Sequence, residues 1–151
     1  MDIESLLAGQ RSEVIDEAFE SLGRSHEVHY EESGEEFTRG SLSDLFDLVV
    51  TALRDRQLGP VSIYCEDVAE RRFAAGFGIS EVQTAFNALE VAMWRRLVAG
   101  VPPQGLAEAV GLLSTILGFG KDALARRYVS LASERHVPTL DLSALFAGTE
   151  G

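Results

Sequence analysis

Hydrophobic side chains recur along this chain at steps of three and four residues, the spacing that places them on one side of an α-helix. The clearest stretch runs from Phe73 to Leu97. It predicts the end of one helix, a break at the glycines 76 and 78, and a long amphipathic helix. Ser80, followed three residues later by Gln83, is typical of a capped helix start. The buried side of this helix is expected to carry Val82, Phe86, Leu89, Met93 and Leu97.

The same periodicity predicts four further helices. Glycine and proline mark most of their ends, because both residues are unfavourable in a helix interior. We expect these helices over residues 3–22, from Ser41 to about Arg56, from Pro60 to about Ala75, and from residues 103–105 to Pro138. Residues 23–40 are rich in acidic side chains and contain two glycines, so an interrupted or irregular helix is expected there.

These elements predict a single all-α domain over residues 1–151, a bundle of five to six helices with a short C-terminal tail at 138–151. No stretch alternates hydrophobic and polar residues in the way that a β-strand does. A chain of 151 residues, of which 46% are hydrophobic, is long enough to bury a stable core without disulfides. Its single cysteine, Cys65, excludes an intramolecular disulfide framework.

The last long helix carries an apolar stripe wide enough that it must be covered by other helices. We expect this helix to be central in the bundle or to form half of a dimer interface. Its glycines at 111, 118 and 120 lower helix propensity, and close approach of another backbone is the expected compensation. The candidate dimer seam consists of Leu106, Val110, Leu113, Leu117, Leu124 and Tyr128.

The formal net charge is −11, and most of it lies in the first third of the chain. Residues 1–47 hold 13 acidic residues against three arginines. Nucleic acid is not expected as a partner, because binding to a phosphate backbone requires a basic patch. The acidic region is interpreted as a solvated surface. No apolar run approaches the roughly 18 residues of a membrane span, and no secretory signal begins the chain, so we expect no membrane partner and a cytoplasmic protein.

Motifs that carry chemistry are incomplete in this sequence. A phosphate-binding loop before Lys121 lacks its first glycine, and no nucleophile elbow or zinc-protease motif occurs. His26 and His29 lie three residues apart and make a metal site conceivable, but a solvated histidine pair is the favoured interpretation. Acidic neighbours argue against Cys65 as a nucleophile. We therefore predict no enzyme activity, no cofactor, and no catalytic, cofactor-binding or metal-ligating residue.

Arginine pairs stand late in three of the predicted helices, at residues 71–72, 95–96 and 126–127. Positive charge there meets the negative end of the helix dipole, which explains these positions adequately. Arg71 and Arg72 are expected to lie mostly in solvent, because the apolar positions of their helix fall on another side.

The run from Glu70 to Gly100, ERRFAAGFGISEVQTAFNALEVAMWRRLVAG, resembles the N-terminal helical sensor domain of RsbR-type co-antagonists of RsbT, which act in bacterial stress-response signalling. Tyr128 also suits that pattern. The resemblance implies an all-helical input domain, similar in some members to a globin without haem, usually dimeric and joined to an output module. No output module follows the last helix, so we expect action on other signalling proteins in trans.

Two functional hypotheses follow. The favoured one is a non-catalytic regulatory domain that acts through protein–protein interaction as a homodimer. The alternative is a sensor for a small molecule, haem or a metal, with a pocket between helices that would be lined by Phe73, Phe77, Phe86, Met93 and Trp94. These five residues are also consistent with an ordinary aromatic core. A metal-dependent enzyme that uses His26 and His29 is a third and weaker hypothesis.

Overall fold

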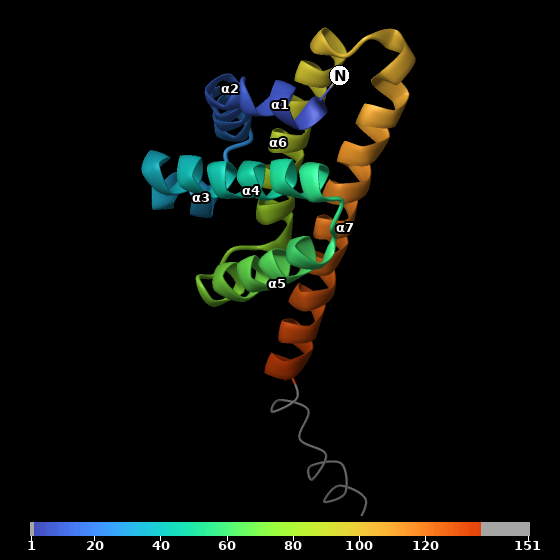
Figure 1. Cartoon of the computed structure of the whole chain (residues 1–151). Helices are drawn as coiled ribbons and strands as arrows, with labels where there is room; N and C mark the ends of the chain where they lie inside the picture. The colour runs from blue at the N-terminus through green and yellow to red at the C-terminus, as the bar shows by residue number, and fades with distance from the viewer. Residues whose placement is uncertain (1, 137–151) are drawn as a thin grey trace, which may run out of the picture.

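The computed structural model describes residues 2–136, and these residues form helices joined by short turns (Figure 1). The all-α prediction is confirmed. The predicted tail at 138–151 lies outside the described residues. In chain order the helices are α1 (Ile3–Ala8), α2 (Arg11–Arg24), α3 (Val28–Ser33), α4 (Glu35–Asp55), α5 (Gly59–Ala74), α6 (Ile79–Gly100) and α7 (Pro103–His136).

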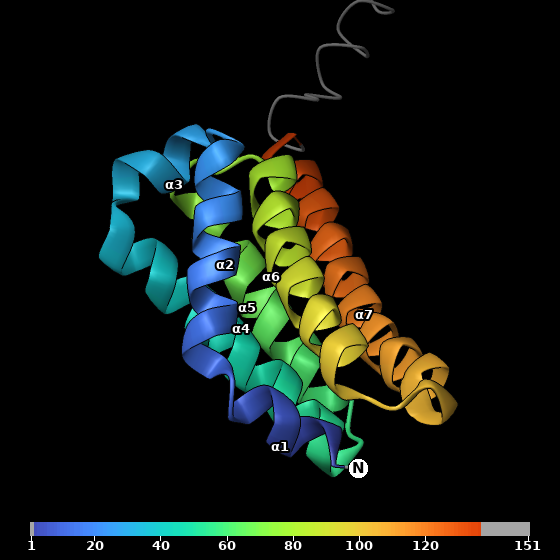
Figure 2. The same ribbon diagram turned by 90° about the horizontal axis from the view of Figure 1, so that it is seen from above.

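Helix α6 lies between α2 and α7, and the three run side by side (Figure 2). Helices α4 and α5 cross this row on one side, so that no helix of residues 2–136 covers the opposite side of α6 and α7. The most extensive contacts join α5 to α7, α2 to α6, and α6 to α7. Figure 1 shows α7 as the longest helix, running along the edge of the molecule.

The N-terminal region differs from the prediction of one helix over residues 3–22. The chain turns at Gly9 and Gln10, which separates a short α1 from α2. Helix α1 then packs on the far end of α6, where a Cβ atom added at Gly100 would lie 2.9 Å from the Leu6 side chain. A larger residue at this position would require the Leu6 side chain to move.

The predicted helix start at Ser41 is wrong. Helix α4 begins at Glu35, directly after Gly34, whose positive φ of 94° ends the short helix α3. Ser41 therefore lies inside α4, where its hydroxyl donates to the Phe37 carbonyl at 2.9 Å. The region expected to be an interrupted or irregular helix is helical with two breaks, one at residues 25–27 and one at Gly34.

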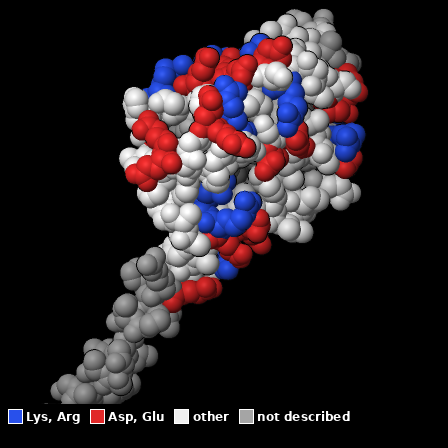
Figure 3. All heavy atoms as spheres, turned by 90° about the vertical axis from the view of Figure 1, so that its left-hand side faces the viewer, with Lys and Arg blue, Asp and Glu red and all other residues white. Residues whose placement is uncertain are grey.

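Ion pairs between helices engage a few of the acidic side chains in the first third of the chain. Arg11 of α2 donates two hydrogen bonds of 2.9 Å to Asp47 of α4, and Arg39 of α4 contacts Asp16 of α2 at 2.6 Å. Figure 3 shows the face that is on the left in Figure 1, with acidic and basic side chains next to each other. These contacts are exposed, so each contributes only about 0–1 kcal/mol of stability.

Candidate functional site

Helix α6 exposes hydrophobic side chains on the side that faces away from α4 and α5. Val91, Trp94 and Val98 are each exposed by 43–45%, although they are large and apolar. Their spacing of three and four residues places them on one side of α6. A cluster of exposed large apolar side chains on one helix face marks an interaction site more often than ordinary surface.

The neighbouring surface of α7 is built from small residues. Ala107, Gly111, Ser114 and Gly118 are exposed and follow one another at steps of four, three and four along the helix. A Cβ atom added at Gly111 or Gly118 would have no neighbour within 4 Å. The close approach that would compensate for these two glycines is therefore not supplied by the part of the chain that the structure describes.

A hollow of about 340 Å³ lies between the exposed apolar residues of α6 and the small residues of α7, and the three form one surface. The hollow is lined by Asn87, Glu90, Val91, Trp94, Val110, Ser114 and Lys121. Lys121 closes one end, where its ammonium contacts Glu90 at 2.6 Å and Asn87 at 3.0 Å. We call the surface formed by Val91, Trp94, Val98 and the small residues of α7 the α6–α7 face.

A second region of interest is the junction where α3 meets the start of α6. Glu81 is buried there and accepts three hydrogen bonds: from the backbone N–H of His29 at 2.9 Å, from His29 Nδ1 at 2.6 Å and from the Gly78 N–H at 2.8 Å. The helix begins at Ile79 with Gly78 as its N-cap. The predicted capping pair Ser80–Gln83 is therefore wrong, and Glu81 is the residue that reaches back to the cap.

The family model for the RsbT co-antagonist protein rsbRD N-terminal domain matches residues 7–141. This chain belongs to that family. No curated protein and no solved structure is a significant match. The family shown by this match is the one that the run Glu70–Gly100 resembles, and it makes the chain a bacterial stress-signalling regulatory domain.

In this RsbRD N-terminal domain the apolar stripe of α7 lies inside the single chain. Leu113, Leu117, Leu124 and Tyr128 are buried against the other helices of the same chain, while Leu106 and Val110 are half-buried. The stripe is thus covered within the chain, although α7 itself runs along the edge of the molecule and not through its centre (Figure 1). Buried side chains such as Leu113 do not reach a partner in this conformation, and of the six only Val110 borders the α6–α7 face.

The five aromatic and sulfur-containing residues of the predicted pocket are distributed over different surroundings. Phe86 and Met93 are buried in the core, and Trp94 is exposed on the α6–α7 face. The Phe77 ring packs against Tyr30, and Phe73 packs edge-on against Tyr128 at 5.8 Å between ring centroids. Phe86 and Trp94 line two different hollows, so the described structure does not gather the five around one pocket.

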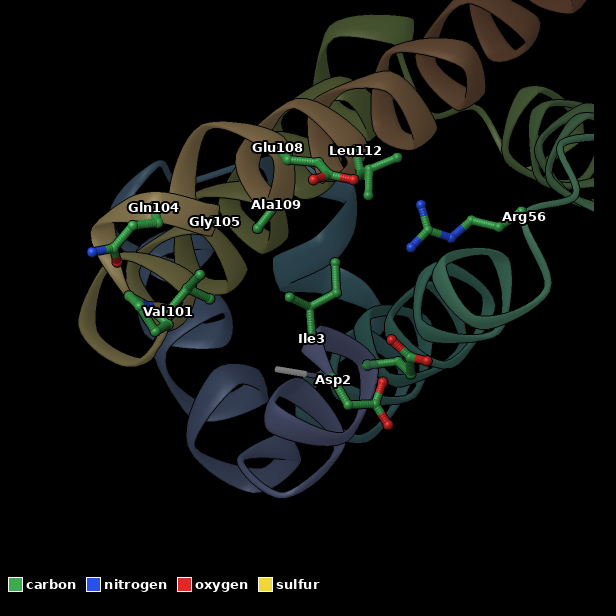
Figure 4. Close-up of a pocket in the computed structure, with 11 residues that line it drawn as sticks. Asp2, Ile3, Arg56, Val101, Gln104, Gly105, Glu108, Ala109 and Leu112 are labelled. Carbon is green, nitrogen blue, oxygen red and sulfur yellow. The ribbon is translucent and has the colours of Figure 1, made fainter.

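Another hollow, of about 430 Å³, opens at one end of the bundle between α1, the end of α4 and the start of α7 (Figure 4). Figure 4 shows the Arg56 side chain extending toward it from the end of α4. Arg56 ends α4 in the left-handed conformation, with a φ of 56°. The walls of this hollow combine apolar residues with charged residues of both signs: Ile3, Val101, Ala109, Leu112, Arg56, Asp2, Glu4 and Glu108. This is a solvated cleft and includes none of the five predicted pocket residues.

The candidate metal-binding and nucleophilic residues have structural surroundings in this RsbRD N-terminal domain. His26 contacts Glu31 at 2.9 Å, whereas His29 turns to Glu81, so the two histidines point to different carboxylates. Within the described residues, no three His, Cys, Asp or Glu side chains come together in a metal-binding group. Burial, reinforced by nearby Glu66, raises the pKa of the Cys65 thiol to about 12, so it stays protonated and inert near neutral pH.

Sequence reasoning missed the burial of Arg72, which was expected in solvent. Its guanidinium carbon lies 4.7 Å from the centre of the Phe37 ring and 5.5 Å from that of Phe77. The other arginine pairs also make specific contacts: Arg96 reaches Glu17 at 3.4 Å, and Arg127 reaches Glu70 at 3.0 Å. Helix periodicity could not predict the burial of Arg72, because this residue lies outside the core stripe of α5 and is covered by residues of α3 and α4.

Replacing Glu81 with glutamine should lower the free energy of unfolding by about 2 kcal/mol, because an amide nitrogen cannot accept the hydrogen bonds from His29 and Gly78. Burial raises the pKa of Glu81, but hydrogen bonds from the backbone N–H groups of His29 and Gly78 and from the His29 ring outweigh it and lower the pKa below 4.5. The carboxylate therefore stabilises the fold above pH 4.5 and loses this effect as the pH falls through its folded-state pKa.

Urea unfolding of the wild type and of Glu81→Gln at pH 7 and pH 4 measures the difference in their free energies of unfolding. This difference should be smaller at pH 4 than at pH 7. Glu20→Gln is the matched control, since Glu20 is exposed on α2 and should change stability by less than about 0.5 kcal/mol. Equal stability of wild type and Glu81→Gln at pH 7 would contradict the assignment.

No helix in residues 2–136 combines the length and the hydrophobicity that a bilayer span needs.

Proposed function

We propose that this RsbRD N-terminal domain is a non-catalytic input domain that acts as a homodimer through its α6–α7 face and passes its signal on by contact with other signalling proteins. The single observation that carries the proposal is the pairing of exposed Val91, Trp94 and Val98 with a parallel stripe of small residues. Such a face offers both projecting side chains and room to receive them.

A second copy of the chain is the occupant that this geometry favours. A twofold dimer uses the same patch on both subunits, so the patch must be complementary to itself. The projecting side chains of α6 and the small residues of α7 meet this condition: Trp94 of one copy can lie over Ser114 and Gly118 of the other. Helices α6 and α7 of two copies would then form a four-helix arrangement.

Charge also favours this face over the rest of the surface. Each chain has a formal net charge of −11, so two copies repel one another unless they meet where the charge is balanced. On the α6–α7 face Glu90 is already neutralised by Lys121 at 2.6 Å. The acidic surface formed by the first third of the chain lies on other helices.

The non-catalytic assignment is supported by the chemistry of the described residues. Burial keeps the Cys65 thiol protonated, and the His29–Glu81 pair is used to join α3 to α6. These groups have structural partners, and a regulatory role for the family does not require a reaction. Output by contact with a second signalling protein is then the simplest mechanism.

Sedimentation analysis of the purified chain tests the dimer. The wild type should be dimeric at tens of micromolar, whereas Trp94→Glu and Gly118→Arg should be monomeric and still folded. Truncation of a buried interface tryptophan costs about 2–4 kcal/mol, which weakens association by roughly 30- to 1000-fold. Both changed side chains are exposed in the single chain, so its helix content should stay the same.

Ile63→Glu is the matched control, because Ile63 is 71% exposed on α5, on a different face. It should leave the dimer intact. A wild-type monomer at this concentration, or dimers in both face variants, would refute the α6–α7 interface.

A further inference from the structure

Arg72 stands near the end of α5 and is only 6% exposed. Its guanidinium is held between aromatic rings of Phe37 and Phe77, and its Nη2 donates to the Ser41 hydroxyl at 2.8 Å. The Ser41 hydroxyl in turn donates to the Phe37 carbonyl. The side chain is thus fixed in place by α4 and by the turn between α5 and α6.

The positive charge of Arg72 has no anionic partner among the described residues. The adjacent Arg71 is exposed and pairs with Asp67 at 2.8 Å, whereas no ion pair of Arg72 is found and its Nε is buried without an acceptor. The nearby Glu81 uses its oxygens for His29 and Gly78. A buried charge without a partner is costly, and cation–π contacts offset only a part of that cost.

Neighbouring tyrosines do not supply the missing negative charge. Burial raises the pKa of Tyr30 above its ordinary value and that of Tyr64 to about 12, so both hydroxyls remain protonated near neutral pH. A protonated hydroxyl can still donate a hydrogen bond. Near Arg72 the structure therefore offers neutral hydroxyls, one of which, Tyr30, accepts from Arg72 itself, while the carboxylate of Glu81 is engaged with His29 and Gly78.

A small, partly open cavity lies beside these donors. It has a volume of about 20 Å³, and its polar lining consists of Tyr30, Ser41, Tyr64 and Arg72. The remaining wall is apolar and comes from α4, α5 and α6: Leu42, Leu45, Val68, Ala85 and Phe86. This volume holds one water molecule or one monatomic ion and is too small for phosphate, sulfate or a carboxylate ligand.

We propose that this cavity binds a single monatomic anion of the chloride type, held by Arg72 and the hydroxyls of Tyr30 and Tyr64. The anion supplies the buried acceptor and charge that Arg72 lacks. Because the lining residues belong to α3, α4 and α5, its binding stabilises the packing of these helices over α6. The site is separate from the α6–α7 face and does not depend on dimer formation.

Thermal unfolding in sodium chloride and in sodium gluconate at equal ionic strength tests this site, because the gluconate anion is too large for the cavity. Chloride should raise the Tm of the wild type above its value in gluconate, by roughly 5–10 °C at one hundred times the dissociation constant. Bromide should act in the same way. Crystals grown in bromide should show one anomalous peak in the cavity beside Arg72.

Arg72→Met should abolish the difference between chloride and gluconate, whereas Arg71→Met, the same change one residue away on the exposed surface, should retain it. Should Arg72→Met fail to fold, Tyr64→Phe keeps the charge, removes one donor and should weaken chloride binding about tenfold. Equal wild-type Tm in the two salts, a water without bromide in the cavity, or an undiminished chloride effect in Tyr64→Phe and Arg72→Met would overturn the proposal.

Discussion

Replacing Leu117 with aspartate is expected to unfold the chain. Leu117 lies in the middle of α7 and is only 1% exposed, within the core that α7 forms with the neighbouring helices. The substitution removes a buried side chain and leaves a carboxylate without a partner, at a combined cost of about 5 kcal/mol or more. Domains of this size have a total stability of about 5–15 kcal/mol. Far-ultraviolet circular dichroism and thermal unfolding should show loss of helix and of a cooperative transition.

Ser114→Asp is the control on the same helix, because Ser114 is exposed and tolerates a charge. This variant should stay folded, with weaker association as the α6–α7 face predicts. The pair of variants also separates two interpretations of the apolar stripe of α7. A Leu117→Asp variant that remained folded as a monomer would show that the stripe is a dimer contact, and would contradict its position in the core.

Replacing Gly120 with leucine should lower the free energy of unfolding by about 3 kcal/mol. A Cβ atom at this position would lie 3.0 Å from the Cys65 sulfur and 3.3 Å from a methyl carbon of Val61, where α7 crosses α5. The rest of a leucine side chain has no space without separating the two helices, and such overpacking outweighs the gain of about 1 kcal/mol in helix propensity. The Tm should fall by roughly 6–12 °C.

Gly40→Leu is the matched control, since Gly40 is an exposed glycine in α4 and a Cβ atom there has no neighbour within 4 Å. It should raise stability by up to about 1 kcal/mol through helix propensity alone. Chemical unfolding of both variants gives the comparison. A Gly120→Leu protein as stable as Gly40→Leu would mean that α5 and α7 are not in close contact at this point.

The presence of the helices and their buried sides were predictable, because the spacing of apolar residues within each helix determines both. Helix ends were less so. Ser41 is followed by Asp44 and has the residues of a cap, yet α4 continues through it, because Gly34 provides the true break and the intervening residues are compatible with helix. At the start of α6 the prediction missed by two residues, since a glycine cap carries no side-chain signal and Glu81 supplies the hydrogen bond instead.

The partners of each side chain were far less predictable. A stripe such as Leu113 and Leu117 shows that a side of α7 must be covered, but the pattern is the same whether the cover is α5 of the same chain or a second chain. Conversely, Trp94 looks like a core or pocket residue in the sequence. Its exposure became evident only when α4 and α5 were seen to cover the other side of α6.

By itself the sequence determined that this protein is all-α, that its helices are amphipathic, and that it resembles the family to which it belongs. The tertiary structure alone decided which charges are buried and which apolar residues are exposed. Arg72 and Tyr30 are 42 residues apart in sequence and line one cavity because α4 packs against both α3 and α5. Periodicity is a property of a single helix, whereas burial depends on segments that are distant along the chain, so the candidate sites follow from the packing of the helices.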